Sequence, residues 1–65
     1  MDFETKVLAV VKSVTDTRAY FFNGTMFLET EDSKIATEVF FALCDQVATP
    51  VACQAAGQSE ISYDF

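Results

Sequence analysis

Histidine is absent from this 65-residue sequence, which also contains only two cysteines, two glycines and one proline. Without histidine there is no Ser-His or Cys-His nucleophile pair, and the commonest side-chain ligand of transition metals is missing. Two cysteines alone cannot complete a zinc site of the usual kind. Two glycines cannot build the glycine-rich phosphate loops of nucleotide-binding proteins. We therefore expect no enzyme, no cofactor and no metal centre.

The two cysteines, Cys44 and Cys53, do not form a C-x-x-C motif. Residues 1–6 lack the basic segment that begins a secretory signal, and the apolar run at residues 7–11 is too short for a signal core or a membrane span. We expect a complete small product that stays in the cytoplasm, where thiols remain reduced. Both cysteines are predicted to be free thiols at core or half-buried positions, with a disulfide as the alternative.

Positive charge is also scarce. The formal net charge is −6 at pH 7, because ten carboxylates outnumber four cations. The cations are scattered along the chain, at Lys6, Lys12, Arg18 and Lys34. Nucleic-acid binding and attraction to anionic membranes both depend on clustered Lys and Arg side chains. We expect no nucleic-acid and no membrane partner, whereas an acidic surface favours a protein partner with a basic surface.

Apolar and aromatic side chains are plentiful. Apolar residues make up 51% of the chain, and seven Phe and two Tyr are among them. This content suffices for a core and is too high for a disordered chain. A domain of this size buries only about 60% of the surface of its unfolded chain, and small folds often add self-association. We predict a single domain over residues 1–65.

The clearest local signal is the Asn-Gly pair at positions 23–24, between two runs of β-forming residues. A type I′ turn needs positive φ at both central positions, which Asn and Gly tolerate best. The two-residue loop fixes the register, with Phe21 opposite Met26 and Tyr20 opposite Phe27. One face is wholly apolar and is predicted to face the core: Ala19, Phe21, Met26 and Leu28. The other face is mixed: Arg18, Tyr20, Phe22, Thr25, Phe27 and Glu29.

Residues 30–33 predict a helix start, because they combine capping side chains with carboxylates at the positive end of the helix dipole. Apolar side chains at helical spacing follow on one face: Ile35, Ala36, Val39, Phe40, Leu43 and Val47. Thr49-Pro50 is expected to end this helix and to begin a short second turn closed by Gly57. Residues 60–65 alternate, which predicts a third strand joined to the hairpin by a β-α-β crossover.

The N-terminal residues 3–14 are ambiguous. Apolar side chains at helical spacing favour a helix, whereas the four valines favour a strand. We favour the helix, which gives a small two-layer α+β domain with helices packed on one face of a three-stranded sheet that contains a β-hairpin. The predicted order is α-β-β-α-β. The alternative is β-β-β-α-β.

Two surfaces are candidates for protein binding. The first consists of Tyr20, Phe22 and Phe27 on the outer hairpin face, because aromatic rings beside charged groups are typical of interface hot spots. The alternative is that the N-terminal segment covers this face and makes the three rings part of the core.

The second candidate surface is Phe41 between Glu38 and Asp45, on the polar side of the predicted helix. A large apolar residue can anchor a partner there, while the carboxylates attract a basic surface. The alternatives are an isolated surface Phe or one that touches the C-terminal strand. An open sheet edge is a third possibility, for strand addition or edge-to-edge dimerisation, although the charged terminal strand is not an obviously adhesive edge.

Three carboxylates gather before the predicted helix: Glu29, Glu31 and Asp32. Such a cluster can bind Mg²⁺ or Ca²⁺ or act as an acid–base pair. We favour the simpler interpretation, in which these charges complement the helix dipole and pair with Arg18.

These features favour a non-enzymatic protein-binding module, a regulator or inhibitor that docks on a larger host protein. In compactness, acidity and lack of catalytic chemistry it resembles small phage-encoded proteins that act on host proteins. Two alternatives remain open. One is a structural, self-assembling subunit, such as a homodimer, and the other is an acidic nucleic-acid mimic.

Overall fold

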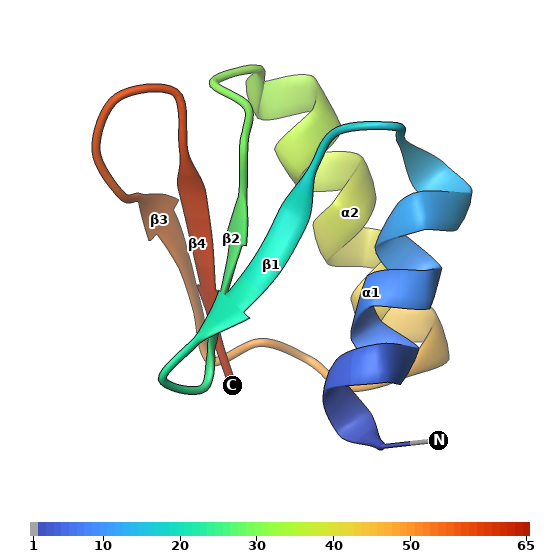
Figure 1. Cartoon of the computed structure of the whole chain (residues 1–65). Helices are drawn as coiled ribbons and strands as arrows, with labels where there is room; N and C mark the ends of the chain where they lie inside the picture. Colours follow the sequence, from blue (N-terminus) through green and yellow to red (C-terminus); the bar gives the residue numbers. More distant parts are fainter. Residues whose placement is uncertain (1) are drawn as a thin grey trace.

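The computed structural model describes residues 2–65 as an α+β domain in which two helices pack on one face of a four-stranded antiparallel sheet (Figure 1). The strand order in the sheet is β1-β2-β4-β3. The elements follow the order α-β-β-α-β-β, as α1 (Phe3–Val14), β1 (Ala19–Phe22), β2 (Thr25–Leu28), α2 (Ser33–Gln46), β3 (Ala52–Ala55) and β4 (Ile61–Asp64).

Helix α1 confirms the helical interpretation of the N-terminal segment. The Asp2 side chain caps it by accepting a 2.7 Å hydrogen bond from the Thr5 backbone N–H. Val7 and Val11, four residues apart, are both buried on its inner side. The β-β-β-α-β alternative is therefore wrong, because the packing of one apolar helical face outweighs the β preference of valine.

The hairpin of β1 and β2 has the predicted register, with Phe21 opposite Met26 and Tyr20 opposite Phe27. The backbone φ angles of Asn23–Gly24 are 52° and 80°, as a type I′ turn requires. The apolar face of this hairpin points toward the helices. This part of the fold follows from local sequence alone.

Helix α2 also begins where the capping residues predict. The Asp32 side chain accepts a 2.9 Å hydrogen bond from the Lys34 backbone N–H. The predicted apolar face points inward, and Ala36, Val39 and Leu43 are buried.

The sheet has four strands, not three. Residues 50–57, where a short second helical turn was predicted, contain β3 instead. The sequence of β3 has no β-branched residue and no alternation of apolar and polar side chains, so its pattern does not favour a strand. Pairing with β4 decides the conformation, and Cys53 lies opposite Tyr63. Gly57 and Ser59, both with positive φ, reverse the chain between the two strands.

Strand β4 lies inside the sheet, between β2 and β3, and is antiparallel to both. The predicted β-α-β crossover to the terminal strand is therefore wrong. The helical crossover from β2 leads instead to β3, and β4 returns between the two because β3 and β4 form a hairpin. The edges of the sheet are β1 and β3, as Figure 1 shows in cyan and brown.

The core lies between the sheet and the helices. Its fully buried side chains come from both layers: Val7, Val11, Met26, Leu28, Val39, Leu43 and Tyr63. The two cysteines do not contribute to it, contrary to prediction. Cys44 and Cys53 are free and exposed, since one lies on the solvent side of α2 and the other on an edge strand. No helix formed by residues 2–65 is long and apolar enough to cross a membrane.

Candidate functional site

The face of the sheet opposite the helices, here called the outer sheet face, carries the first predicted surface. Helix α1 packs Val7 and Val11 against the inner side chains Met26 and Leu28, so the interpretation in which the N-terminal segment covers the outer rings is wrong. The register of the four strands assigns eight outward side chains to the outer sheet face: Tyr20, Phe22, Thr25, Phe27, Ala52, Gln54, Ser62 and Asp64.

Tyr20 and Phe27 form a fixed aromatic pair on this face. Their rings are stacked, with centroids 5.4 Å apart and planes inclined by 22°. The Arg18 guanidinium lies over the Tyr20 ring at 5.4 Å from its centroid. The Tyr20 hydroxyl donates a 2.6 Å hydrogen bond to Glu60, and this bond raises the pKa of Tyr20 above its ordinary value. Both rings are half-buried, and the contacts described here define one arrangement of the pair.

Phe22 is the freest ring of the predicted set, with 64% of its surface exposed. It lies at the turn end of β1, opposite Thr25. The Thr25 hydroxyl donates a 2.8 Å hydrogen bond to Asp64, which holds the Asp64 carboxylate beside Thr25. A large, exposed aromatic side chain has the character of an interface anchor.

The side chains of the outer sheet face include three aromatic rings on β1 and β2 and none on β3 and β4. Ser62 continues the cross-strand row of Tyr20 and Phe27, and Ala52 ends the row of Phe22. Small side chains thus adjoin large rings in both rows. Ser62 is only 5% exposed, so its neighbours already cover this part of β4, and contact with a partner falls to the larger side chains around it.

The second predicted surface lies elsewhere. Phe41 is 65% exposed, and its ring lies edge-to-face with that of Phe40, with 6.1 Å between centroids. Glu38 and Asp45 beside it are also exposed. Because the opposite side of α2 packs on the sheet, Phe41 points away from the sheet. The structure therefore does not bring the six predicted site residues together; it divides them between opposite sides of the domain.

The three carboxylates before α2, Glu29, Glu31 and Asp32, each interact with a different partner. Glu29 forms a 3.0 Å ion pair with Arg18, and Asp32 caps α2. Glu31 accepts a 3.3 Å hydrogen bond from Ser59. Among residues 2–65, no group of three or more metal-ligating side chains converges.

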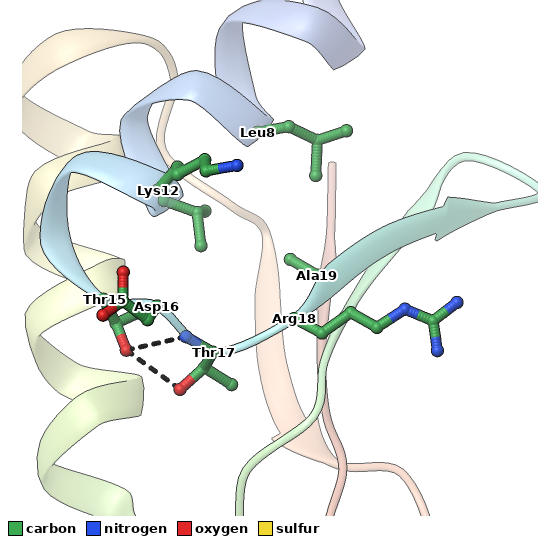
Figure 2. A pocket seen from close by; sticks show the side chains of 8 residues that line it. Leu8, Lys12, Thr15, Asp16, Thr17, Arg18 and Ala19 are labelled. Carbon is green, nitrogen blue, oxygen red and sulfur yellow. Dashed lines mark hydrogen bonds between the residues drawn. The ribbon is translucent and has the colours of Figure 1, made fainter.

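A cleft of about 300 Å³ lies between the end of α1 and the start of β1 (Figure 2). Its lining comprises Leu8, Val11, Lys12, Thr15, Asp16, Thr17, Arg18 and Ala19. No sequence motif marks these positions, so sequence reasoning missed them. In Figure 2 the Lys12 amine lies beside α1 and the Arg18 guanidinium beside the start of β1, so the charged ends of these two side chains are not brought together.

Turn chemistry explains the polar wall of this cleft. The Thr15 hydroxyl accepts a 3.2 Å hydrogen bond from the Thr17 backbone N–H, and the two threonine hydroxyls lie 2.9 Å apart. These bonds close the connection from α1 to β1. The polar groups of the cleft thus serve the loop, and the outer sheet face remains the stronger candidate.

Comparison of the chain with protein-family models, with curated proteins and with solved structures found no match. Functional inference therefore depends on the geometry and chemistry of the surfaces described above.

Proposed function

We propose that this chain is a protein-binding module that docks on a larger protein through its outer sheet face and regulates or inhibits it. One observation carries the proposal: among residues 2–65, no helix covers an aromatic sheet face whose outermost ring, Phe22, is 64% exposed. A two-layer fold has one sheet face that can be left to a partner.

The aromatic pair of this face suits binding for an entropic reason. Binding is weakened by the ordering of side chains at the interface. The stacking of Tyr20 on Phe27 and the hydrogen bond to Glu60 have already ordered these rings in the free protein. A partner that contacts them loses little further conformational entropy, so more of the contact energy appears as affinity.

The charges of this surface support a partner with a basic surface. Glu29, Glu60 and Asp64 surround the rings, and Arg18 is the cation beside them. The net charge of −6 extends the negative field beyond this patch, which accelerates encounter with a basic protein and repels nucleic acids and anionic membranes.

The proposed setting is the cytoplasm of a host cell, as for small phage-encoded regulators. The two thiols at Cys44 and Cys53 are free and exposed. Exposed thiols persist where the environment is reducing and are rare in secreted small domains.

Affinity capture with matched variants tests the proposal. The tagged chain and its Phe22→Ala and Phe41→Ala variants are incubated with lysate of the cells that produce the protein. Loss of an interface anchor costs about 2 kcal/mol or more, which is roughly thirtyfold in affinity. Phe22→Ala should therefore lose the captured partner. Phe41→Ala, on the opposite side, removes an equally exposed ring and should retain it.

Two results would overturn this assignment. One is equal recovery by Phe22→Ala and the unchanged chain, and the other is loss of the partner only with Phe41→Ala. Salt distinguishes the nucleic-acid mimic: capture by an aromatic anchor weakens modestly as ionic strength rises, whereas a phosphate-like acidic array loses its partner steeply.

A further inference from the structure

Strand β3 is an open sheet edge. It pairs with β4 on one side, and none of the strands formed by residues 2–65 pairs with its other side. Three of its four side chains are exposed, namely Cys53, Gln54 and Ala55. Figure 1 shows β3 at the far edge of the sheet from α1. An unprotected edge offers unpaired N–H and C=O groups to any other strand.

The charge pattern singles out this edge. Residues 46–59 contain no Asp, Glu, Lys or Arg, although 22% of the chain is charged. Natural proteins commonly protect edge strands with charged side chains, proline or a covering segment. The only proline, Pro50, precedes β3 and does not lie within it. The edge is therefore left chemically unprotected over its whole length.

The opposite edge is better covered. Strand β1 follows the charged residue Arg18, and three of its four side chains are half-buried. Helix α1 lies against β1 and is connected to it by residues 15–18, as Figure 1 shows. Of the two edges, β3 is the accessible one.

The direction of the backbone groups on β3 follows from its bonds to β4. The Ala56 N–H donates to the Glu60 carbonyl at 2.9 Å, so residue 56 faces β4. Backbone groups alternate along an antiparallel strand, so Gln54 also faces β4. Cys53 and Ala55 then direct their N–H and C=O groups away from the sheet, which leaves two donors and two acceptors unpaired on the edge.

We propose that β3 pairs antiparallel with β3 of a second copy, so that the two sheets of a homodimer become continuous. The two-fold axis passes between the two Gln54 residues, one from each copy. These two residues lie directly opposite each other and exchange no main-chain hydrogen bonds. Cys53 of each copy then exchanges both main-chain hydrogen bonds with Ala55 of the other. Such an interface is self-complementary, as two-fold symmetry requires.

The charge distribution places the contact between two copies at this edge and not elsewhere on the surface. Two chains of charge −6 repel one another over most of their surfaces. The charge-free segment at residues 46–59 is the place where two copies can approach with least repulsion. Because four residues make a small contact, the dimer should form in a concentration-dependent manner.

Sedimentation velocity over a concentration series tests the dimer with matched charge variants. Gln54→Lys places two like charges directly opposite each other at the axis, which should raise the dissociation constant about tenfold or more. Gln58→Lys makes the same chemical change at an exposed position in the turn after β3. It should leave the dissociation constant within about twofold of the original, since it lies outside the pairing. Equal effects of the two variants would contradict the proposal.

Cysteine cross-linking tests the register independently. With both natural cysteines changed to Ser, Gln54→Cys brings two thiols opposite each other at about 4.5 Å between Cα atoms, within disulfide range. Mild oxidation should convert this variant to covalent dimer, while Gln58→Cys in the same background should stay monomeric. Circular dichroism of each variant checks that the fold is retained.

A chain that remains monomeric at the highest attainable concentration overturns the proposal and leaves the β3 edge to a strand from another protein. Dimerisation with equal cross-linking of the two cysteine variants overturns the stated register. Neither experiment involves the partner of the outer sheet face, so this inference and the proposed function can fail separately.

Discussion

The Tyr63 hydroxyl donates a 2.8 Å hydrogen bond to the Ala36 carbonyl in the buried interior. It connects the inner strand β4 with the first half of α2, and the Tyr63 side chain has no exposed surface. A buried hydroxyl needs such a partner, because burial without one costs free energy. This bond thus helps to fix the position of α2 relative to β4.

Removal of this hydroxyl should lower the free energy of unfolding. We expect Tyr63→Phe to lose about 0.5–1.5 kcal/mol, the net value of a typical intramolecular hydrogen bond. Urea denaturation measures the change. Tyr20→Phe, which deletes the same atom on the outer sheet face, is the control and should lose less. A Tyr63→Phe protein as stable as the original would show that the bond is not needed.

Alkaline pH should destabilise the fold through the same residue. Burial raises the pKa of Tyr63 well above its ordinary value, whereas the unfolded chain ionises this phenol near pH 10. The stabilisation is complete below about pH 10 and decreases as the pH rises from there toward the pKa in the folded state.

Absorbance of tyrosinate during an alkaline titration checks this prediction. Tyr20, whose pKa is also raised but whose ring lies at the surface, should ionise before the fold is lost. Tyr63 should ionise together with unfolding, as circular dichroism reports it. Ionisation of both residues in one step near pH 10 with the fold intact would contradict the expected burial.

The hairpin illustrates what local sequence can predict. Asn23–Gly24 favours a type I′ turn, and the alternation of flanking side chains then places Phe21 on the core face and Phe22 on the opposite face. Every step uses residues within a few positions of one another. The same holds for α2, whose cap and apolar face lie within one segment.

Strand β3 illustrates what local sequence cannot predict. Its residues prefer no conformation strongly, and Gly57 alone suits a helix end as well as a hairpin turn. The strand forms because β4 presents free backbone groups beside it, and β4 is itself paired with β2, which is distant in sequence. The candidate surfaces show the same limit. The sequence identifies Phe22 and Phe41 as candidate anchors, but it does not show that they lie on opposite sides of the domain.

Two nearby residues of α2 should contribute very differently to stability, because one is buried and the other is exposed. Leu43 is fully buried and Phe41 is 65% exposed. Leu43→Ala leaves a cavity and should reduce stability by about 2–5 kcal/mol, which is a large share of the stability of so small a domain. Phe41→Ala should change it by no more than about 0.5 kcal/mol. Thermal unfolding compares the two, and similar losses would place Phe41 in the core.

The cap of α1 should respond to pH in the opposite sense to Tyr63. Hydrogen bonds from the side chain and backbone N–H of Thr5 hold the pKa of Asp2 below its ordinary value. The ionised carboxylate therefore stabilises the folded state above the pKa of the unfolded chain, and this contribution is lost as the pH falls through the folded-state pKa.

Two substitutions separate the charge of Asp2 from its capping role. Asp2→Ala removes the acceptor and should lower the melting temperature at pH 7, because the first turn of α1 loses a partner for its free N–H groups. Asp2→Asn keeps an acceptor oxygen and should retain most of the stability while its pH dependence in acid becomes weaker. If Asp2→Ala and the original chain melt alike at pH 7 and throughout the acid range, the cap contributes nothing, and the apolar contacts of α1 suffice to hold it in the fold.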